Sequence, residues 1–227
     1  MNERTYSIIE SYMLHCMEDS AHDKEHVYRV LYNALEIAKT EQNVDLDVLI
    51  GACLLHDIGR KEQFENPELC HAQVGSEKAY DFLIKNGFEK SFAENIRHCV
   101  LTHRYREANQ PQTIEAKILF DADKLDVTGA IGIARTLIYN GTVSEPIYSL
   151  SSNGDVSDGS SDEPPSFFHE YKFKLERIYS RFYTAEGKRM AEKRRQTAVD
   201  FYDSLFSEVN DSYRNGQDIL KEVITSA

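Results

Sequence analysis

Apolar residues recur at intervals of three and four positions along most of the chain. Over residues 25–38 they occupy positions 27, 30, 31, 34, 35 and 38, with polar residues between them. This is the period of an amphipathic helix. The same spacing predicts helices over 72–85, 92–103, 113 to about 139 and 175–206, the last interpreted as two helices that break near Gly187. No stretch alternates with a period of two between hairpin turns, so the pattern predicts an all-α fold.

One predicted helix is apolar on every side. It covers residues 46–55, and Gly59 provides a plausible end for it. A helix of this kind is buried instead of lying on the surface. His56 and Asp57 follow the apolar run directly. An imidazole and a carboxylate should therefore lie together at the end of a buried helix.

The segment 149–166 differs from the rest of the chain, because it is rich in Ser, Gly and Asp and has few residues to bury. Such a segment cannot offset its ordering entropy, and we expect a mobile loop. It separates residues 1–148, expected to form the helical core, from residues 167–227. The latter are expected to form C-terminal helices that pack on the same domain.

The charge of the chain limits its partners. Among 227 residues, 38 are acidic and 26 are Lys or Arg, giving a net charge of −12. Binding to DNA or RNA depends on Lys and Arg meeting phosphates, so a nucleic-acid polymer is not expected as a partner. If the protein handles phosphate esters, a bound divalent cation is the obvious group to neutralise them.

The sequence pattern predicts neither a membrane-spanning segment nor a signal peptide. No apolar run approaches the roughly 20 residues that span a bilayer, and the first residues lack the regions of a signal peptide. The four cysteines form no C-x-x-C pair, which fits free thiols in a reducing compartment. We expect a soluble, cytoplasmic protein without a membrane partner.

Two groups of residues are candidates for chemistry. A buried pair such as His56 and Asp57 must have partners, and a divalent metal ion or a helix cap with backbone hydrogen bonds would each supply them. The second group is Asp121, Asp123 and Asp126, set among apolar residues. On a helix Asp123 and Asp126 lie roughly 60° apart while Asp121 points away from both. One or two of these acids can therefore face a site.

The order of these motifs resembles the HD superfamily of metal-dependent phosphohydrolases. The matching segments are A-H-D-K-E-H-V-Y-R-V, L-L-H-D-I-G and E-A-K-I-L-F-D-A-D-K-L-D-V-T-G. They look like the bacterial subgroup of HD-domain predicted hydrolases. The resemblance implies an HD-domain helical bundle for the core. It also implies metal ligands at His26, His56, Asp57 and Asp123, with Asp121 as the alternative to Asp123. His22 is not the implied ligand.

Two further histidines raise the number of metal ions that the resemblance allows. His71 and His103 occupy places where dinuclear members carry additional ligands, and Asp57 would then bridge two ions. Alternatively, His71 caps a helix and binds phosphate, while His103 acts as a general acid. The resemblance implies one or two divalent ions per chain, and such ligands accept Mn, Fe, Co, Ni, Mg or Zn.

The resemblance implies an enzyme that cleaves a phosphate ester or anhydride by metal-activated water. The expected substrate is a small phosphorylated metabolite such as a nucleotide. Asp57, Lys61 and His103 are the expected catalytic residues, with Lys61 facing the substrate phosphate. Two alternatives remain, a dinuclear iron oxygenase and a metal-bound ligand sensor without activity. The aromatic C-terminal helices either complete the core or form the contact of a homo-oligomer.

Overall fold

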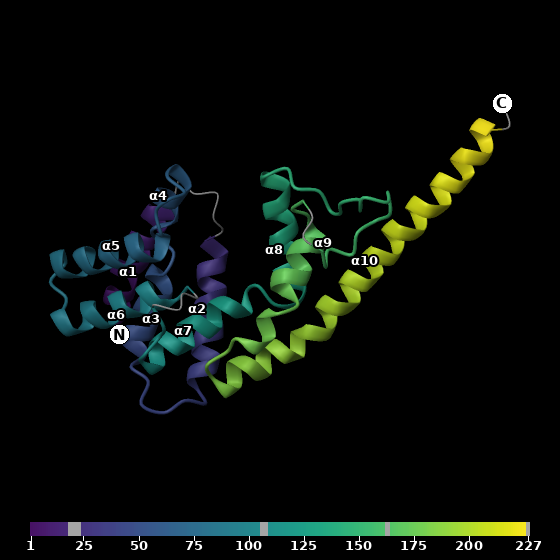
Figure 1. The fold of residues 1–227 in the computed structure, drawn as a ribbon. Helices are drawn as coiled ribbons and strands as arrows, with labels where there is room; N and C mark the ends of the chain where they lie inside the picture. Colours follow the sequence, from purple (N-terminus) through teal and green to yellow (C-terminus); the bar gives the residue numbers. More distant parts are fainter. Residues whose placement is uncertain (18–23, 105–108, 162–163, 226–227) are drawn as a thin grey trace. The chain divides into compact units, whose positions relative to one another are not determined.

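The computed structural model describes residues 1–17, 24–104, 109–161 and 164–225. These residues form helices and connecting segments without a named strand, which confirms the predicted all-α fold (Figure 1). None of the described helices is both long enough and apolar enough to cross a membrane. His22 lies outside the described residues.

The chain divides into two compact units, and the first contains the segments that match the HD motifs. Unit 1 comprises Met1–Asp126 and Phe182–Arg189. Its helices are α1 (Glu3–Met17), α2 (Lys24–Ala38), α3 (Leu46–Leu55), α4 (Arg60–Glu65), α5 (His71–Lys85), α6 (Lys90–Thr102) and α7 (Ile114–Leu125).

Helix α3 is the central element of unit 1. It begins at the N-cap residue Asp45, whose carboxylate accepts hydrogen bonds from the amides of Asp47 and Val48. Seven of its ten residues are buried, as its continuous apolar run predicts. The helix packs against α1, α2, α6 and α7. Its C-terminal end therefore lies among elements from distant parts of the sequence.

The turn after α3 approaches helix α5 very closely. A Cβ atom added to Gly59 would lie 2.3 Å from the carbonyl oxygen of His71 and 2.6 Å from the amide nitrogen of Gly75. Only a residue without a side chain fits at this contact. The close approach brings the first turn of α5 next to the His56–Asp57 pair.

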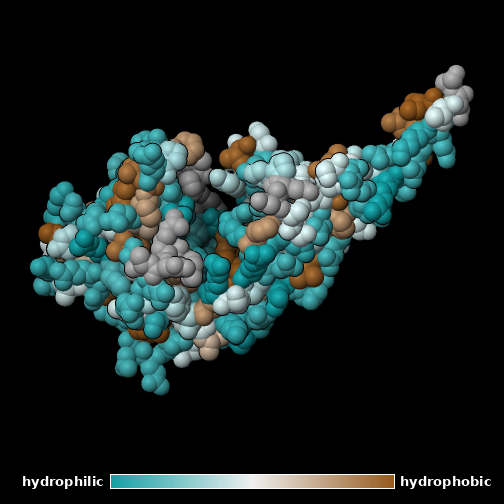
Figure 2. All heavy atoms as spheres, viewed as in Figure 1, coloured by the Kyte–Doolittle hydropathy of each residue, from teal (hydrophilic) through white to brown (hydrophobic). Residues whose placement is uncertain are grey.

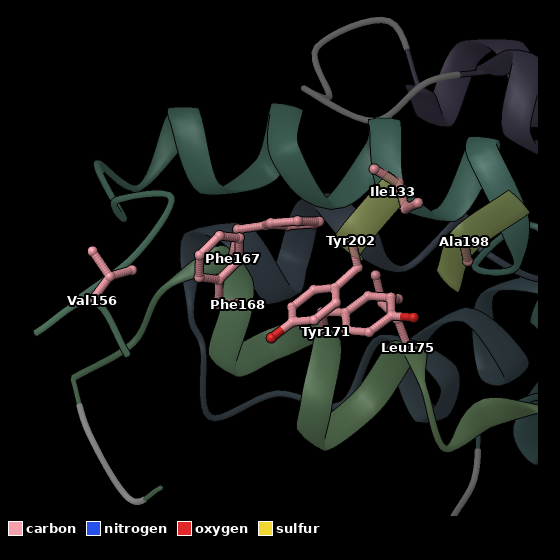
Figure 3. Close-up of a cluster of buried hydrophobic side chains, with 8 residues drawn as sticks. All are labelled: Ile133, Val156, Phe167, Phe168, Tyr171, Leu175, Ala198 and Tyr202. Atoms are coloured by element: carbon pink, nitrogen blue, oxygen red, sulfur yellow. The ribbon is translucent and has the colours of Figure 1, made fainter. Parts of the chain in front are cut away.

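Unit 2 comprises Val127–Arg181 and Met190–Ala227. Its elements are α8 (Gly129–Thr142), α9 (Phe167–Glu170), a π-helical turn (Tyr171–Leu175), a 3-10 turn (Ile178–Ser180) and most of α10 (Ala185–Thr225). A largely aromatic cluster fills its interior (Figure 3). Within it Tyr171 stacks on Tyr202 with ring centroids 4.2 Å apart.

The segment 149–166 contributes to this interior. Its described residues contain one isolated bridge, between Leu150 and Val156. Val156 is buried in the aromatic cluster, and the hydroxyl of Tyr202 donates a hydrogen bond to the carbonyl of Asp158. The mobility of this segment and the proposed division at residues 148 and 166 stay predictions.

Two helix boundaries differ from the sequence predictions. The helix expected from 113 to about 139 is two helices, because the chain turns at Asp126–Thr128 between α7 and α8. The break expected near Gly187 is found slightly earlier, at residues 181–184, and Gly187 lies in the first turn of the continuous helix α10. A Cβ at Gly187 would lie 2.7 Å from a carboxylate oxygen of Asp121. This glycine therefore serves close packing at the start of a helix.

Candidate metal centre

Three polar side chains from three helices form a first cluster in unit 1. His26 comes from α2, His56 is the C-cap of α3, and Asp123 comes from α7. The Nε2 atom of His26 lies 3.3 Å from Nε2 of His56 and 3.3 Å from Oδ1 of Asp123. The two imidazoles are almost completely buried. These atoms converge as ligands of a single metal ion do.

A second cluster consists of Asp57, His71 and His103. His71 is the first residue of α5, and His103 is the C-cap of α6. Their Nε2 atoms lie 3.2 Å apart. All three side chains are buried. The cluster is thus a second convergent set of nitrogen and oxygen ligand atoms.

The carboxylate of Asp57 faces both clusters. Its Oδ2 atom lies 3.6 Å from Nε2 of His26 and 3.7 Å from Nε2 of His56. Its Oδ1 atom lies 3.4 Å from Nε2 of His71 and 3.6 Å from Nε2 of His103. One carboxylate therefore presents a different oxygen to each pair of imidazoles. This is the arrangement in which a single carboxylate can bridge two cations.

The four histidines present the same nitrogen to the centre. In each ring Nδ1 contacts an oxygen acceptor, the partners being a carboxylate oxygen of Asp126, the carbonyl of Cys53, Oε1 of Gln63 and the carbonyl of Val100, at 2.6–2.7 Å. Nδ1–H donates to each acceptor, so Nε2 is left as the ligand atom that faces the centre. Histidines that bind metals are held in this way by a hydrogen bond from the other ring nitrogen.

The electrostatics of the centre favour cations. Burial alone would raise the pKa of Asp57, but the neighbouring His56 and Arg60 outweigh it, and the pKa lies well below its usual value. Burial lowers the pKa of His56 to about 4 and, together with nearby Arg60, that of His71 to about 2. These two imidazoles are therefore neutral near pH 7 and able to bind a metal.

The protonation state of His26 differs from that of His56 and His71. Burial lowers its pKa, but hydrogen bonds to Asp123 and Asp126 outweigh burial and raise the pKa to about 9. Near neutral pH the imidazole of His26 therefore carries a proton on both nitrogens and lies between the carboxylates of Asp123 and Asp126. A metal ion that bound its Nε2 would displace this proton.

Cationic side chains surround the centre. Arg60 Nε donates to Oδ1 of Asp57 at 2.9 Å, and Arg29 Nε donates to Asp126 at 2.8 Å. Lys124 Nζ lies 3.9 Å from Asp123 and above the ring of Phe120. Lys61, the cation expected to meet substrate, is half-buried on α4. Its role stays a prediction.

Asp121 and Asp123 have separate surroundings, although they are two residues apart. The carboxylate of Asp121 accepts hydrogen bonds from the amides of Tyr183 and Thr184 and from the hydroxyl of Thr184. It therefore connects α7 to the segment before α10, while Asp123 lies with His26 and His56. Of the two alternatives, only Asp123 is part of a convergent ligand set.

Three residues support the centre in positioning roles that were not predicted from the sequence. Asp126 orients His26, Gln63 orients His71, and Arg60 contacts Asp57. The spacing of Asp123 and Asp126 placed both on one helix face and could have indicated the first of these. Gln63 had no signal, because its contact depends on how α4 packs against α5.

Comparison with known proteins agrees with this geometry. The family model of the HD domain matches residues 24–128. YpgQ of Bacillus subtilis is 29% identical over 196 residues, covering 85% of this chain and 86% of YpgQ. Residues 24–128 therefore match the HD domain, and the chain is similar to HD-superfamily proteins.

Solved structures show the same likeness. An HD-superfamily hydrolase from Bacillus thuringiensis is 28% identical, with a TM-score of 0.67 over 92% of this chain and 97% of the other. A predicted HD-superfamily hydrolase from an uncultured Thermotogales bacterium is 29% identical, with a TM-score of 0.57 over 90% and 91%. YpgQ in complex with ADP shares the fold, with a TM-score of 0.70 at 24% identity over 90% and 95%.

Proposed function

We propose that this protein is a phosphohydrolase that depends on two divalent metal ions. The observation that carries the proposal is Asp57, whose two oxygens face two separate pairs of imidazoles. The likeness to HD-superfamily hydrolases supports a hydrolytic reaction.

The donor set fits two ions. His26, His56, Asp123 and Oδ2 of Asp57 would hold the first, and His71, His103 and Oδ1 of Asp57 would hold the second. Imidazole and carboxylate ligands suit Mn, Fe, Co, Ni and Zn, and carboxylates also suit Mg. Bound ions of this kind polarise a phosphoryl oxygen and lower the pKa of a coordinated water to about 7.

The side chains around the ligands complete the proposed site. Asp126 holds the ring of His26 in one orientation and tautomer. Arg60 and Lys124 place positive charge beside Asp57 and Asp123, and Lys61 is the further cation that we propose meets the substrate phosphate. Positive charge at these positions compensates for the acidic character of the chain where a phosphate would bind.

A nucleotide is the substrate class that we propose. YpgQ shares the fold of this chain and has been solved in complex with ADP. Phosphate esters and anhydrides of nucleotides carry the closely spaced negative charges that a pair of cations neutralises.

A dinuclear iron oxygenase is the second candidate, because the paired clusters would also hold two iron ions. The two reactions differ in one measurable respect. Hydrolysis proceeds without oxygen, whereas an oxygenase consumes it. Turnover of a phosphorylated substrate under anaerobic conditions supports the hydrolase.

The test is a hydrolysis assay on protein purified without chelator. Release of phosphate or pyrophosphate is followed over nucleoside mono-, di- and triphosphates, each with Mn²⁺, Mg²⁺, Co²⁺, Ni²⁺ or Zn²⁺. The variant His103→Ala should lose activity by at least about 100-fold, because a ligand is removed from the second cluster. The control is His98→Ala, a nearby histidine outside both clusters, which should retain activity. Metal-independent hydrolysis, or none with any nucleotide, contradicts the proposal.

A further inference from the structure

The end of α10 exposes a group of large apolar side chains. Ile219, Leu220, Val223 and Ile224 are 61%, 58%, 62% and 64% exposed. The last turns of the helix extend beyond α8 and α9 of the same unit (Figure 1), and hydrophobic surface gathers there (Figure 2). Single exposed apolar residues are ordinary, but a contiguous patch marks an interaction surface.

The exposed residues continue a stripe that is partly buried earlier in the helix. Nine residues from 202 to 223 lie within about 60° of one direction at 100° per residue. They are Tyr202, Leu205, Val209, Ser212, Tyr213, Gly216, Ile219, Leu220 and Val223. No charged residue of this stretch of helix lies within that sector. Tyr202 is packed in the interior of unit 2, so one apolar face runs from the core to the exposed end.

Gly216 lies in the middle of the uncovered part of this stripe. Glycine weakens a helix interior, and its conformational freedom is not used here because the helix is continuous. A Cβ at Gly216 would meet no atom of the described residues within 4 Å. Packing within one copy of the chain therefore gives no reason for a residue without a side chain at this position.

A groove lies immediately before Gly216 on the same helix. It has a volume of about 470 Å³ and is lined by Tyr148, Leu205, Glu208, Val209, Ser212 and Tyr213. All of these except Tyr148 belong to α10. Groove and exposed patch are thus on one helix, on either side of Gly216.

We propose that the occupant of this groove is α10 of a second copy of the chain, crossing in the antiparallel direction at Gly216. A two-fold axis at Gly216 pairs residues that lie equally far before and after it. Ile219 then lies level with Tyr213, Leu220 with Ser212 and Val223 with Val209 of the other copy. The three exposed apolar residues of the stripe are thereby placed beside residues that line the groove.

The pairing also explains why residues 212 and 216 have small side chains or none. Ser212 leaves room for Leu220, and the two Gly216 residues meet at the crossing point. Helices pack with axes about 8–10 Å apart, and Cα atoms lie about 2.3 Å from each axis. Facing Cα atoms at the crossing are then separated by roughly 3.4–5.4 Å, which favours glycine. A parallel pair would set the exposed residues against themselves and leave both grooves unfilled.

The first test is the mass of the full chain in solution by light scattering or sedimentation. The native chain should have twice the mass of one copy. The double variant Leu220→Asp, Val223→Asp should weaken dimerisation by at least about 100-fold, because it would bury four unpaired carboxylates in each dimer. Both residues are exposed in the single copy, so folding should be unaffected. Arg214→Asp, on the opposite face of the helix, is the control and should remain a dimer.

The second test determines the register. In the variant Gly216→Cys, the two new thiols lie on either side of the two-fold axis, and oxidation should produce a disulfide-linked dimer, since disulfides join Cα atoms about 4.4–6.8 Å apart. The control is Arg214→Cys. On oxidation it should form no more disulfide-linked dimer than the native chain does. A monomer at all concentrations overturns the proposal. A dimer that resists the double aspartate substitution, or that does not cross-link through residue 216, overturns it equally.

Discussion

At the scale of single residues, Asp57 connects the two clusters. The other candidate ligands depend on partners that hold them in place. The ring of His26 is the clearest case. Its Nδ1 contacts the buried carboxylate of Asp126 at 2.7 Å, and Arg29 holds that carboxylate from the other side. A chain of three residues from α2 and the end of α7 thereby fixes the direction of one ligand atom.

The variant Asp126→Asn tests this positioning role. The side-chain oxygen of asparagine can accept the hydrogen bond from His26. It lacks the negative charge that makes the imidazole a stronger metal ligand. We expect metal affinity at the first cluster to fall about 10- to 100-fold, the usual effect of losing a partner of a ligand. Isothermal titration with Mn²⁺ measures it. Unchanged affinity would show that Asp126 has only a structural role.

Glycines set the distances between the elements of the centre. The contact of Gly59 with the backbone of His71 and Gly75 fixes how closely α5 approaches the turn after α3. That distance determines whether His71 reaches Asp57. The second cluster therefore depends on a backbone contact between residues that are not ligands themselves.

The substitution Gly59→Ala should separate these elements. The new Cβ would meet backbone atoms that can move only with α5, so we expect a loss of stability of about 1–3 kcal/mol and weaker binding of the second ion. Chemical unfolding and metal titration measure the two effects. Gly141→Ala is the control, since a Cβ there meets nothing within 4 Å. Equal behaviour of the two variants would contradict the account.

The start of α10 depends on Thr184. Its hydroxyl accepts a hydrogen bond from the amide of Gly187 and donates one to Asp121. Thr184→Ala removes both, and we expect the free energy of unfolding to fall by about 1–2 kcal/mol, as for the loss of an N-cap. Thr184→Ser retains the hydroxyl and should recover most of this stability in denaturant titrations. If both variants lose the same amount, the hydroxyl is not the cause.

Helical periodicity predicted the elements better than their ends. The buried helix α3 followed from an apolar run without a polar face, and the all-α fold from the absence of alternation. Gly187 located the break only approximately, because a glycine marks either a helix end or a close contact, and only the position of Asp121 distinguishes them. The candidate ligand residues came from the order of the HD motifs. The roles of Asp126, Gln63 and Arg60 could not be predicted, because they arise from packing between helices.

Across the whole molecule, the candidate centre ties five helices of unit 1 together. Its ligands come from α2, α7, the first residue of α5 and the segments that follow α3 and α6. Burying four histidines and two acids at one place is costly without partners. Bound cations would supply these partners and so stabilise the fold.

Removal of metal should therefore lower the melting temperature. An ion present at about 100 times its dissociation constant adds about 2.7 kcal/mol, and each kcal/mol is about 2–4 °C for a chain of this size. We expect a decrease of about 5–10 °C per ion on addition of EDTA, measured by calorimetry and reversed by excess Mn²⁺. A melting temperature that does not respond to chelation or to Mn²⁺ would contradict a metal-bound centre.

The claim that Asp57 joins two metal sites is tested most directly by the number of ions per chain. The measurement is elemental analysis of the protein after equilibrium dialysis against Mn²⁺, with His71→Ala in parallel. We expect about two ions in the native chain and about one in the variant, because only the second cluster loses a ligand. One ion in both proteins would contradict it, and would leave His71 and His103 as contacts to substrate.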